Sequence, residues 1–246
     1  MLCYRGNQGA LRHAAYMRLS KVLLLRLLLS RHHLELAGKD VFDYGFGAGT
    51  FFRYCPTTGR IFGLELDPVN VAEVTAMLGQ RGFAHVNLQT MRIETWENHP
   101  LLDRKYDVIV CSHVIEHLPE PAAFLERIGR CLKQDGVFLG LVPINERSID
   151  PHHVQTMSRA KLEQWTLSAN LRVIDWLETD HWLYRLQPLF TRETGWRHKC
   201  AQAISLGVGM LAIGFGHKLW FHLSRWFGGL TCSQPTQAAF ILRKKD

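Results

Sequence analysis

The sequence has none of the cysteine patterns that hold small secreted domains or zinc ribbons together. Its six cysteines are scattered along the chain, and no C-x-x-C pair occurs. This spacing argues against a disulfide framework and against a zinc ribbon. It favours free, buried thiols in a reducing compartment such as the cytoplasm. The cysteines are Cys3, Cys55, Cys111, Cys131, Cys200 and Cys232.

Low-complexity tracts, internal repeats and long uninterrupted apolar runs are also missing. The apolar segment 22–29 contains Arg26 and is too short to span a bilayer. It is not followed by the small-residue cleavage site of a secretory signal. We therefore expect residues 10–36 to form a leading helix that is buried against the domain. A helix that lies in a membrane interface is the alternative.

Acidic residues are fewer than basic ones, 22 against 29, which gives a formal net charge of +7. The basic residues concentrate near the two ends of the chain, among Leu, Trp and Phe. Such clusters are more typical of attachment to an anionic membrane surface than of a nucleic-acid groove. We expect no nucleic-acid partner. Peripheral membrane attachment is one interpretation of the charge, and an ordinary solvated basic surface is the other.

The most informative segment is an apolar run that leads into glycines at alternating positions. Residues 41–44 are followed by Gly45, Gly47 and Gly49. Glycine lets a backbone turn sharply and approach a ligand closely. Glu65 ends the next apolar run, where a carboxylate can accept hydrogen bonds from two ribose hydroxyls. Together these features predict an adenosine-type nucleotide pocket at the carboxyl edge of a parallel sheet.

The glycine spacing indicates which nucleotide the pocket takes. A dinucleotide fingerprint, G-x-G-x-x-G, would place its third glycine at position 50, where this chain has Thr50. The third glycine instead comes one residue earlier, at Gly49. An NAD-dependent oxidoreductase is therefore an alternative and not the preferred interpretation. A non-catalytic binding protein with the same fold is a second alternative.

Apolar runs and amphipathic segments alternate along the chain. Helices are expected to begin after Asp67, near Pro121 and after Ser158. This alternation predicts an α/β fold with a doubly wound parallel sheet. Its strands are expected near residues 40–44, 60–66, 84–88, 106–111, 137–142, 171–177 and 238–242.

Further motifs follow the glycine loop in a fixed order. They are the strand 106–111 with Ser112–Pro119 after it, the turn Leu132–Gly136, the strand end Val142–Asn145, and His152–Leu162. In this order the motifs resemble those of class I S-adenosylmethionine-dependent methyltransferases, over residues 15–178 and again at 237–244. The resemblance implies S-adenosylmethionine as cofactor. It also implies a seven-stranded, mostly parallel sheet. In that family the connection before the last strand is usually a tight hairpin, whereas about sixty residues separate Leu177 from Ala238 here, so we expect a helical insert before the last strand.

The resemblance implies one methyltransferase domain over residues 1–246. Its parts are expected to be the leading helix at 10–36, a cofactor-binding core at 37–178, a helical insert or lid at 179–236, and the last strand at 237–246.

The resemblance also assigns residues to the cofactor by their position. The loop glycines should surround the methionine moiety, Glu65 should hold the ribose and Leu66 should lie against the adenine. Arg92–Glu94 replaces the acidic residue that often lies near the adenine amino group, and Phe46 is expected to narrow the pocket. The assigned residues are Asp43, Gly45, Gly47, Gly49, Glu65, Leu66, Ile93, Glu94, Ser112 and His113.

Residues 113–117 also spell H-x-x-E-H, a zinc-peptidase pattern. That chemistry needs both histidines on one face of a regular helix. Here the segment directly follows a buried strand, and Pro119 and Pro121 leave little room for a helix. The sequence therefore predicts no metal.

A histidine could serve as the catalytic base. The methyl of a sulfonium is already activated, so the protein mainly aligns the acceptor and excludes water. A base that takes the proton of a hydroxyl or amine acceptor would help, and histidine suits neutral pH. The candidates are His113, His153 and His117, with His152 beside them. The alternative is that His117 and His153 only tie loops to the sheet, and that Glu116 anchors its turn.

The segment before the last strand suggests the class of acceptor. Residues 200–216 carry no charge, and residues 218–227 interleave cations with aromatics. A membrane crossing there would separate the final strand from its sheet. We expect a lid over a small, apolar or lipid-like acceptor, or a shallow membrane insertion. An added core layer is the alternative. The acceptor atom could be O, N or C.

Overall fold

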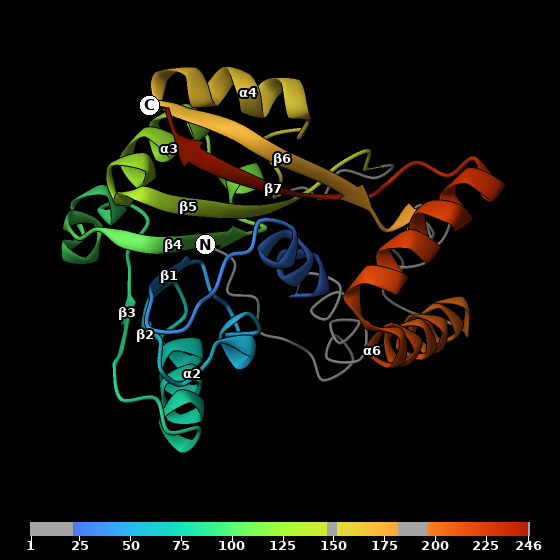
Figure 1. Cartoon of the computed structure of the whole chain (residues 1–246), viewed down its shortest axis with the longest axis horizontal. Coiled ribbons are helices and arrows are strands. Elements are labelled where there is room, and N and C mark those ends of the chain that lie inside the picture. The colour runs from blue at the N-terminus through green and yellow to red at the C-terminus, as the bar shows by residue number, and fades with distance from the viewer. Residues whose placement is uncertain (1–21, 147–151, 182–195, 246) are drawn as a thin grey trace.

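The computed structural model describes residues 22–146, 152–181 and 196–245 (Figure 1). Residues 10–21 of the expected leading helix and Cys3 lie outside these ranges. The described part of the leading helix covers residues 22–31. It ends earlier than the expected residue 36, because a turn begins at His32 and His33 has a φ of 51°.

A seven-stranded sheet with the order β3-β2-β1-β4-β5-β7-β6 forms the centre of the protein. All neighbouring strands are parallel except β7, which runs antiparallel to β5 and β6. This confirms the predicted doubly wound, mostly parallel α/β fold. The strands are β1 Asp40–Tyr44, β2 Arg60–Glu65, β3 Val86–Thr90, β4 Tyr106–Ser112, β5 Leu132–Pro143, β6 Leu171–Thr179 and β7 Gln237–Lys244.

Both faces of the sheet are buried, because side chains alternate along each strand. In β4, Val108 and Val110 belong to one hydrophobic cluster, whereas Ile109 and Cys111 belong to the other. The cluster of Ile109 also contains side chains from the helices α3 and α4. The cluster of Val108 contains side chains from the leading helix and α2. These helices are α2 Pro68–Gln80, α3 Pro121–Arg130 and α4 Arg159–Ser168.

Two helices begin at the caps that the sequence predicts. Oδ1 of Asp67 accepts a hydrogen bond from the amide of Val69 at 2.9 Å, and Pro68 is the first helical residue of α2. Oγ of Ser158 accepts one from the amide of Lys161 at 3.3 Å at the start of α4. Each cap satisfies an amide that has no partner within its helix.

Several strand boundaries differ from the predicted ones. β3 begins at Val86 and not at residue 84. β5 begins at Leu132, so residues 133–136, which were expected to form a turn, belong to the strand. Its pairing with β4 has a register shift between Tyr106 and Val108. β6 and β7 extend their pairing to Thr179 and Gln237. The insert between them is therefore shorter than the expected 179–236.

The cysteines do not all lie in the core. Cys55, Cys111 and Cys131 are buried free thiols, as predicted, but Cys200 and Cys232 are exposed. Cys200 lies in the helix Trp196–Thr231 and Cys232 directly follows it; this helix lies at one side of the sheet in Figure 1.

The insert contains α6, Trp196–Thr231, which is interrupted at Gly216 by a non-helical backbone with φ 74° and ψ 167°. After Gly216 the helix buries Phe221 and Ser224. Gly228 approaches His181 so closely that a Cβ there would lie 2.4 Å from its ring. None of the helices in the described ranges is long and apolar enough to cross a membrane.

An ion cluster lies at the amino end of β1 and β4, away from the glycine loop. Nζ of Lys133 lies 3.0 Å from Oδ2 of Asp40 and 2.8 Å from Oδ2 of Asp107. Hydrogen bonds from Arg60 and Lys133 hold the pKa of Asp40 below its ordinary value. Burial raises the pKa of Asp107, but the hydrogen bonds from Lys133 and the Asp40 amide, together with the charges of the nearby lysines, outweigh burial and the pKa is lowered.

Lys133→Met should lower the free energy of unfolding by about 1 kcal/mol at neutral pH, a value reduced because the side chain is partly exposed and screened by solvent. The lowered pKa values mean that this stabilisation is present above the unfolded pKa of Asp, about 3.9. It is lost as the pH falls through the folded values. Urea unfolding at neutral pH and below pH ~4 measures the difference. A difference that does not shrink in acid would contradict this assignment.

Asp67→Ala should destabilise the protein by about 1 kcal/mol, because the Val69 amide loses its cap. Urea unfolding at neutral pH measures the loss, with Asp135→Ala as the control, since Asp135 is an exposed carboxylate of β5. Equal losses in the two variants would show that the cap contributes nothing specific.

Candidate active site

The glycine loop after β1 has a backbone that only glycine adopts readily. Gly45, Gly47 and Gly49 have φ values of 74°, 51° and 64°. A Cβ at Gly45 would lie 2.6 Å from Val114, and one at Gly49 would lie 2.6 Å from Val74. At Gly47 nothing lies within 4 Å of that position. Two of the glycines therefore allow close packing, and the third leaves open space beside the loop.

Glu65 lies against this loop. Its Oε2 accepts a hydrogen bond from the amide of Gly47 at 2.7 Å, and its Oε1 accepts one from the amide of Leu66 at 2.9 Å. The structure thus brings together two features that the sequence analysis assigned to one nucleotide pocket. The contact places a carboxylate beside the open space at Gly47, at the carboxyl end of β2.

The remaining residues assigned to the cofactor lie near the ends of β1, β2 and β3. Asp43 is buried in β1. Leu66 and Ile93 are exposed apolar side chains, and Glu94 is exposed next to Ile93. Their contacts with a cofactor stay predictions.

Phe46, which was expected to narrow the pocket, has its side chain in the core. Its ring is buried in the core, with its centroid 5.6 Å from that of Phe52. It also lies against Gly63 of β2, where a Cβ would be 2.7 Å from the Phe46 ring. The large side chain is accommodated because it turns into the core beneath the loop, where Gly63 leaves room for it.

Ser112 and His113 follow at the carboxyl end of β4. The hydroxyl of Ser112 is buried and has no hydrogen-bond partner among the described residues. His113 has a left-handed backbone, with φ 55°, and its amide donates to the carbonyl of Leu141 at 2.8 Å. A non-glycine residue in this region is strained, and such strain concentrates at functional sites.

Glu116 is the most deeply buried charged group of the site. It belongs to the short 3-10 turn η4, Ile115–His117, and its side chain is fully buried. Oε1 lies 3.2 Å from Nδ1 of His113. Burial raises the pKa of Glu116, but the imidazoles of His113 and His117 and a backbone amide together outweigh burial, and the pKa lies below its ordinary value. A carboxylate in this position is charged because the neighbouring imidazole compensates for its burial.

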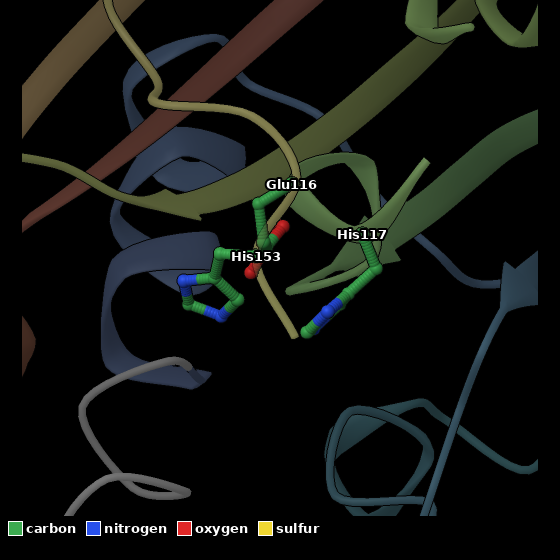
Figure 2. A group of neighbouring side chains, drawn as sticks. All are labelled: Glu116, His117 and His153. Atoms are coloured by element: carbon green, nitrogen blue, oxygen red, sulfur yellow. The ribbon is translucent and has the colours of Figure 1, made fainter. Parts of the chain in front are cut away.

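His117 and His153 lie on either side of this carboxylate in Figure 2, with ring centroids 4.7 Å apart. Nδ1 of His117 lies 2.9 Å from the carbonyl oxygen of His152. Nδ1 of His153 lies 2.8 Å from Oε2 of Glu146. The backbone carbonyl of Glu116 also accepts hydrogen bonds from the amides of residues 154 and 155. Both histidines therefore tie loops together, and Glu116 anchors its turn, as the alternative interpretation expected.

The three histidines proposed as catalytic candidates nevertheless gather around one carboxylate. The H-x-x-E-H segment is a single 3-10 turn preceded by the left-handed His113, so it does not form the helix that a zinc peptidase requires. The sequence predicts only a structural role for Glu116 and gives no indication of Glu146. No sequence signal marks Glu146, because its partner His153 is brought to it only by the folded loop.

Comparison with protein families matches a model described as a methyltransferase domain to residues 12–180. A curated relative from Mycolicibacterium smegmatis, named "Probable S-adenosylmethionine-dependent methyltransferase", is 31% identical over 153 residues, which are 59% of this chain and 56% of the relative. A ubiquinone biosynthesis O-methyltransferase from Neisseria meningitidis is 30% identical over 128 residues, or 50% of this chain and 52% of the relative. The chain thus spans about half the length of the curated relatives it matches.

Solved structures share the fold at low sequence identity. Coclaurine N-methyltransferase, bound to N-methylheliamine and S-adenosylhomocysteine, aligns with a TM-score of 0.57 at 14% identity, covering 91% of this chain and 70% of that chain. The cyclase SpnF aligns with a TM-score of 0.60 at 18% identity, covering 90% of this chain and 79% of that chain. These likenesses concern the fold alone, since one fold hosts different chemistries.

The domain model covers more than half of the chain, and the strand order and the glycine loop agree with it. S-adenosylmethionine is the cofactor of that family. This chain belongs to the class I S-adenosylmethionine-dependent methyltransferase family.

Proposed function

We propose that this protein transfers the methyl group of S-adenosylmethionine to a hydroxyl of a small, apolar or lipid-like acceptor. The observation that carries the proposal is the contact of Glu65 with the amide of Gly47 beside open space in the loop. The hydroxyl as acceptor group is suggested by the names of relatives such as the ubiquinone biosynthesis O-methyltransferase. Methylation of N or C is the alternative.

The residues present fit the cofactor. Gly47 leaves space for a ligand close to the backbone, and the Glu65 carboxylate beside it can accept the ribose hydroxyls. The buried hydroxyl of Ser112 can bind a polar group on the methionine side. When bound, S-adenosylmethionine supplies a methyl carbon that its sulfonium has already activated. Leu66 and Ile93 expose apolar surface that an adenine ring would cover.

His113 is the candidate that takes the proton of the acceptor hydroxyl. Its Nδ1 lies 3.2 Å from Oε1 of Glu116, and the negative charge of this carboxylate favours the tautomer with the proton on Nδ1. In that neutral ring Nε2 is the basic atom. His117 and His153 lie in the same cluster but bond to loop groups through Nδ1, so we assign them to positioning and not to proton transfer.

The second half of α6 supports a lipid-like acceptor. One side of this half carries apolar residues at helical spacing, namely Leu219, Leu223, Trp226 and Leu230. Leu219 is 48% exposed, and Trp226 and Leu230 are each 64% exposed. The exposed cations Lys218 and Arg225 flank this stripe. An exposed apolar stripe beside cations fits a shallow insertion into an anionic membrane surface, from which a lipid-like acceptor is collected.

Wild-type protein should bind S-adenosylhomocysteine and not NAD in calorimetry. Glu65→Gln should weaken this binding by about 30- to 150-fold, which corresponds to the loss of about 2–3 kcal/mol for a charged hydrogen-bond partner. Glu73→Gln is the matched control, because Glu73 is an exposed carboxylate of α2. Unchanged affinity in Glu65→Gln would overturn the ribose assignment. A wild-type protein that binds neither ligand would favour the non-catalytic alternative.

The protein should float with vesicles that contain anionic lipid at low salt and dissociate at high salt. Trp226→Ser together with Leu230→Ser should abolish the flotation, since both side chains belong to the exposed stripe. The control is Leu167→Ser, which removes a comparably exposed leucine from α4 (68% exposed). Wild-type protein that stays wholly in solution at low salt would refute the membrane interpretation.

A further inference from the structure

Three side chains from the turn after β4 and the loop before α4 bring potential metal-ligand atoms close together. Glu116, His117 and His153 each offer one such atom, and these atoms all lie within 4.8 Å of one another (Figure 2). Ligand atoms of a tetrahedral zinc ion lie about 3.3 Å apart, so small side-chain rotations would close the set around an ion. Glu116 comes from the turn after β4 and His153 from a loop before α4. Only the folded chain therefore brings the set together.

The carboxylate in this set is buried and under-satisfied. Glu116 is 0% exposed, and within the described ranges neither of its oxygens has a partner with hydrogen-bond geometry. The nearest group is Nδ1 of His113, 3.2 Å from Oε1, which forms an ion pair when it is protonated. A buried carboxylate is costly without a positive partner. A cation at the common point would supply a partner for the remaining lone pairs.

Each ligand has an outer partner of the kind that metal sites use. Nδ1 of His153 faces the Glu146 carboxylate, and Nδ1 of His117 faces the carbonyl of residue 152. Such contacts fix the tautomer and leave Nε2 as the ligand atom. His113 takes the corresponding place beside Glu116.

The backbone around the set is also held in place. The carbonyl of Glu116 accepts hydrogen bonds from the amides of Val154 and Gln155 at 2.9 and 3.0 Å. These bonds connect the turn after β4 to the loop that carries His153. The positions of the ligands are therefore fixed by contacts that need no ion.

We propose that Glu116, His117 and His153 bind one divalent transition-metal ion. One carboxylate with two imidazoles suits Zn²⁺, Fe²⁺ or Co²⁺ better than Mg²⁺, which prefers oxygen ligands. The sequence analysis predicted no metal because it considered His113 and His117 on a helix. The site proposed here replaces His113 by His153, which lies far away in the sequence.

Three protein ligands leave positions of the ion open, and His117 is exposed. An open position on this side could bind an oxygen of the acceptor and lower the pKa of its hydroxyl. This role rests on the proposed function, because it assumes a hydroxyl acceptor near Ser112 and His113. The binding of the ion does not rest on it.

The test uses the full chain without an added histidine tag, freed of metal by a chelator. Calorimetry with Zn²⁺ or Co²⁺ should show one ion per chain, with Mg²⁺ binding far more weakly. Co²⁺ should also produce visible absorption bands of a nitrogen- and oxygen-ligated site. His153→Gln and His117→Gln should each weaken Zn²⁺ binding by more than about 100-fold, and Glu146→Gln, which removes an outer partner, by about 10- to 100-fold.

His85→Gln is the matched control, because His85 is an exposed histidine before β3. It should bind Zn²⁺ like the wild type. Because Glu116 is buried, its substitution can disturb folding. Zinc binding by Glu116→Gln is therefore interpreted only if the circular dichroism spectrum of the variant matches that of the wild type. Equal Zn²⁺ affinity in wild type, His153→Gln and His117→Gln would overturn the proposal, as would wild-type binding weaker than about 1 mM.

Binding of S-adenosylhomocysteine by the metal-free protein separates the two proposals. If the metal-free protein binds it and no ion binds at Glu116, the methyltransferase proposal stands and the metal proposal falls. If the ion binds and S-adenosylhomocysteine does not, the metal site stands and the cofactor proposal falls.

Discussion

Side chains of the central strands alternate between two buried clusters, so neither face of the sheet has room for a ligand. The polar groups of this part of the chain are therefore placed at the strand ends. At the amino end they form the cluster of Asp40, Asp107 and Lys133, whose charges compensate one another. At the carboxyl end they are Glu65, Ser112 and Glu116. The burial of both faces thus decides where chemistry can occur.

The charged groups at the amino end and at the carboxyl end of the strands differ in how fully their charges are compensated. Lys133 pairs with both carboxylates of its cluster, and the cluster lowers the pKa of each aspartate. At the carboxyl end, Glu116 is buried more deeply, and its charge is opposed by the partially exposed imidazole of His113 and, more weakly, by His117. At the carboxyl end, the Glu116 carboxylate therefore lies beside His117 and His153 without a hydrogen-bond partner among the described residues. Such an arrangement costs stability, and it is the kind of compromise that a binding site requires.

The insert before β7 adds a surface that the sheet itself does not provide. Residues after Gly216 use one side of α6 to bury Phe221 and Ser224 and leave the stripe with Trp226 and Leu230 in solvent. The helix is therefore neither a simple core layer nor an isolated arm. Its inner side contacts the domain, while its outer side is exposed to solvent.

The sequence by itself determined the features that depend on local backbone chemistry. The glycine loop needs positive φ at alternating positions, and only glycine adopts it readily there. Asp67 and Ser158 cap helices because each precedes a helical segment with a side chain that accepts from its first amides. Alternating apolar segments predicted the doubly wound sheet, and the resemblance supplied its seven strands and their mostly parallel order.

Only the tertiary structure decided the features that join distant segments. Phe46 turns into the core because Gly63 of a neighbouring strand leaves room for it. β6 and β7 remain paired as far as Thr179 and Gln237, beyond the apolar residues that predicted the strands. The sequence does not indicate this extension, because the two strands are joined through the long insert and meet only in the folded sheet. Glu116, His117 and His153 share one point because amides of the 154–155 loop bind the carbonyl of Glu116. The spacing of residues along the chain does not predict that these three side chains lie close together, because their proximity depends on how two separate loops pack against each other.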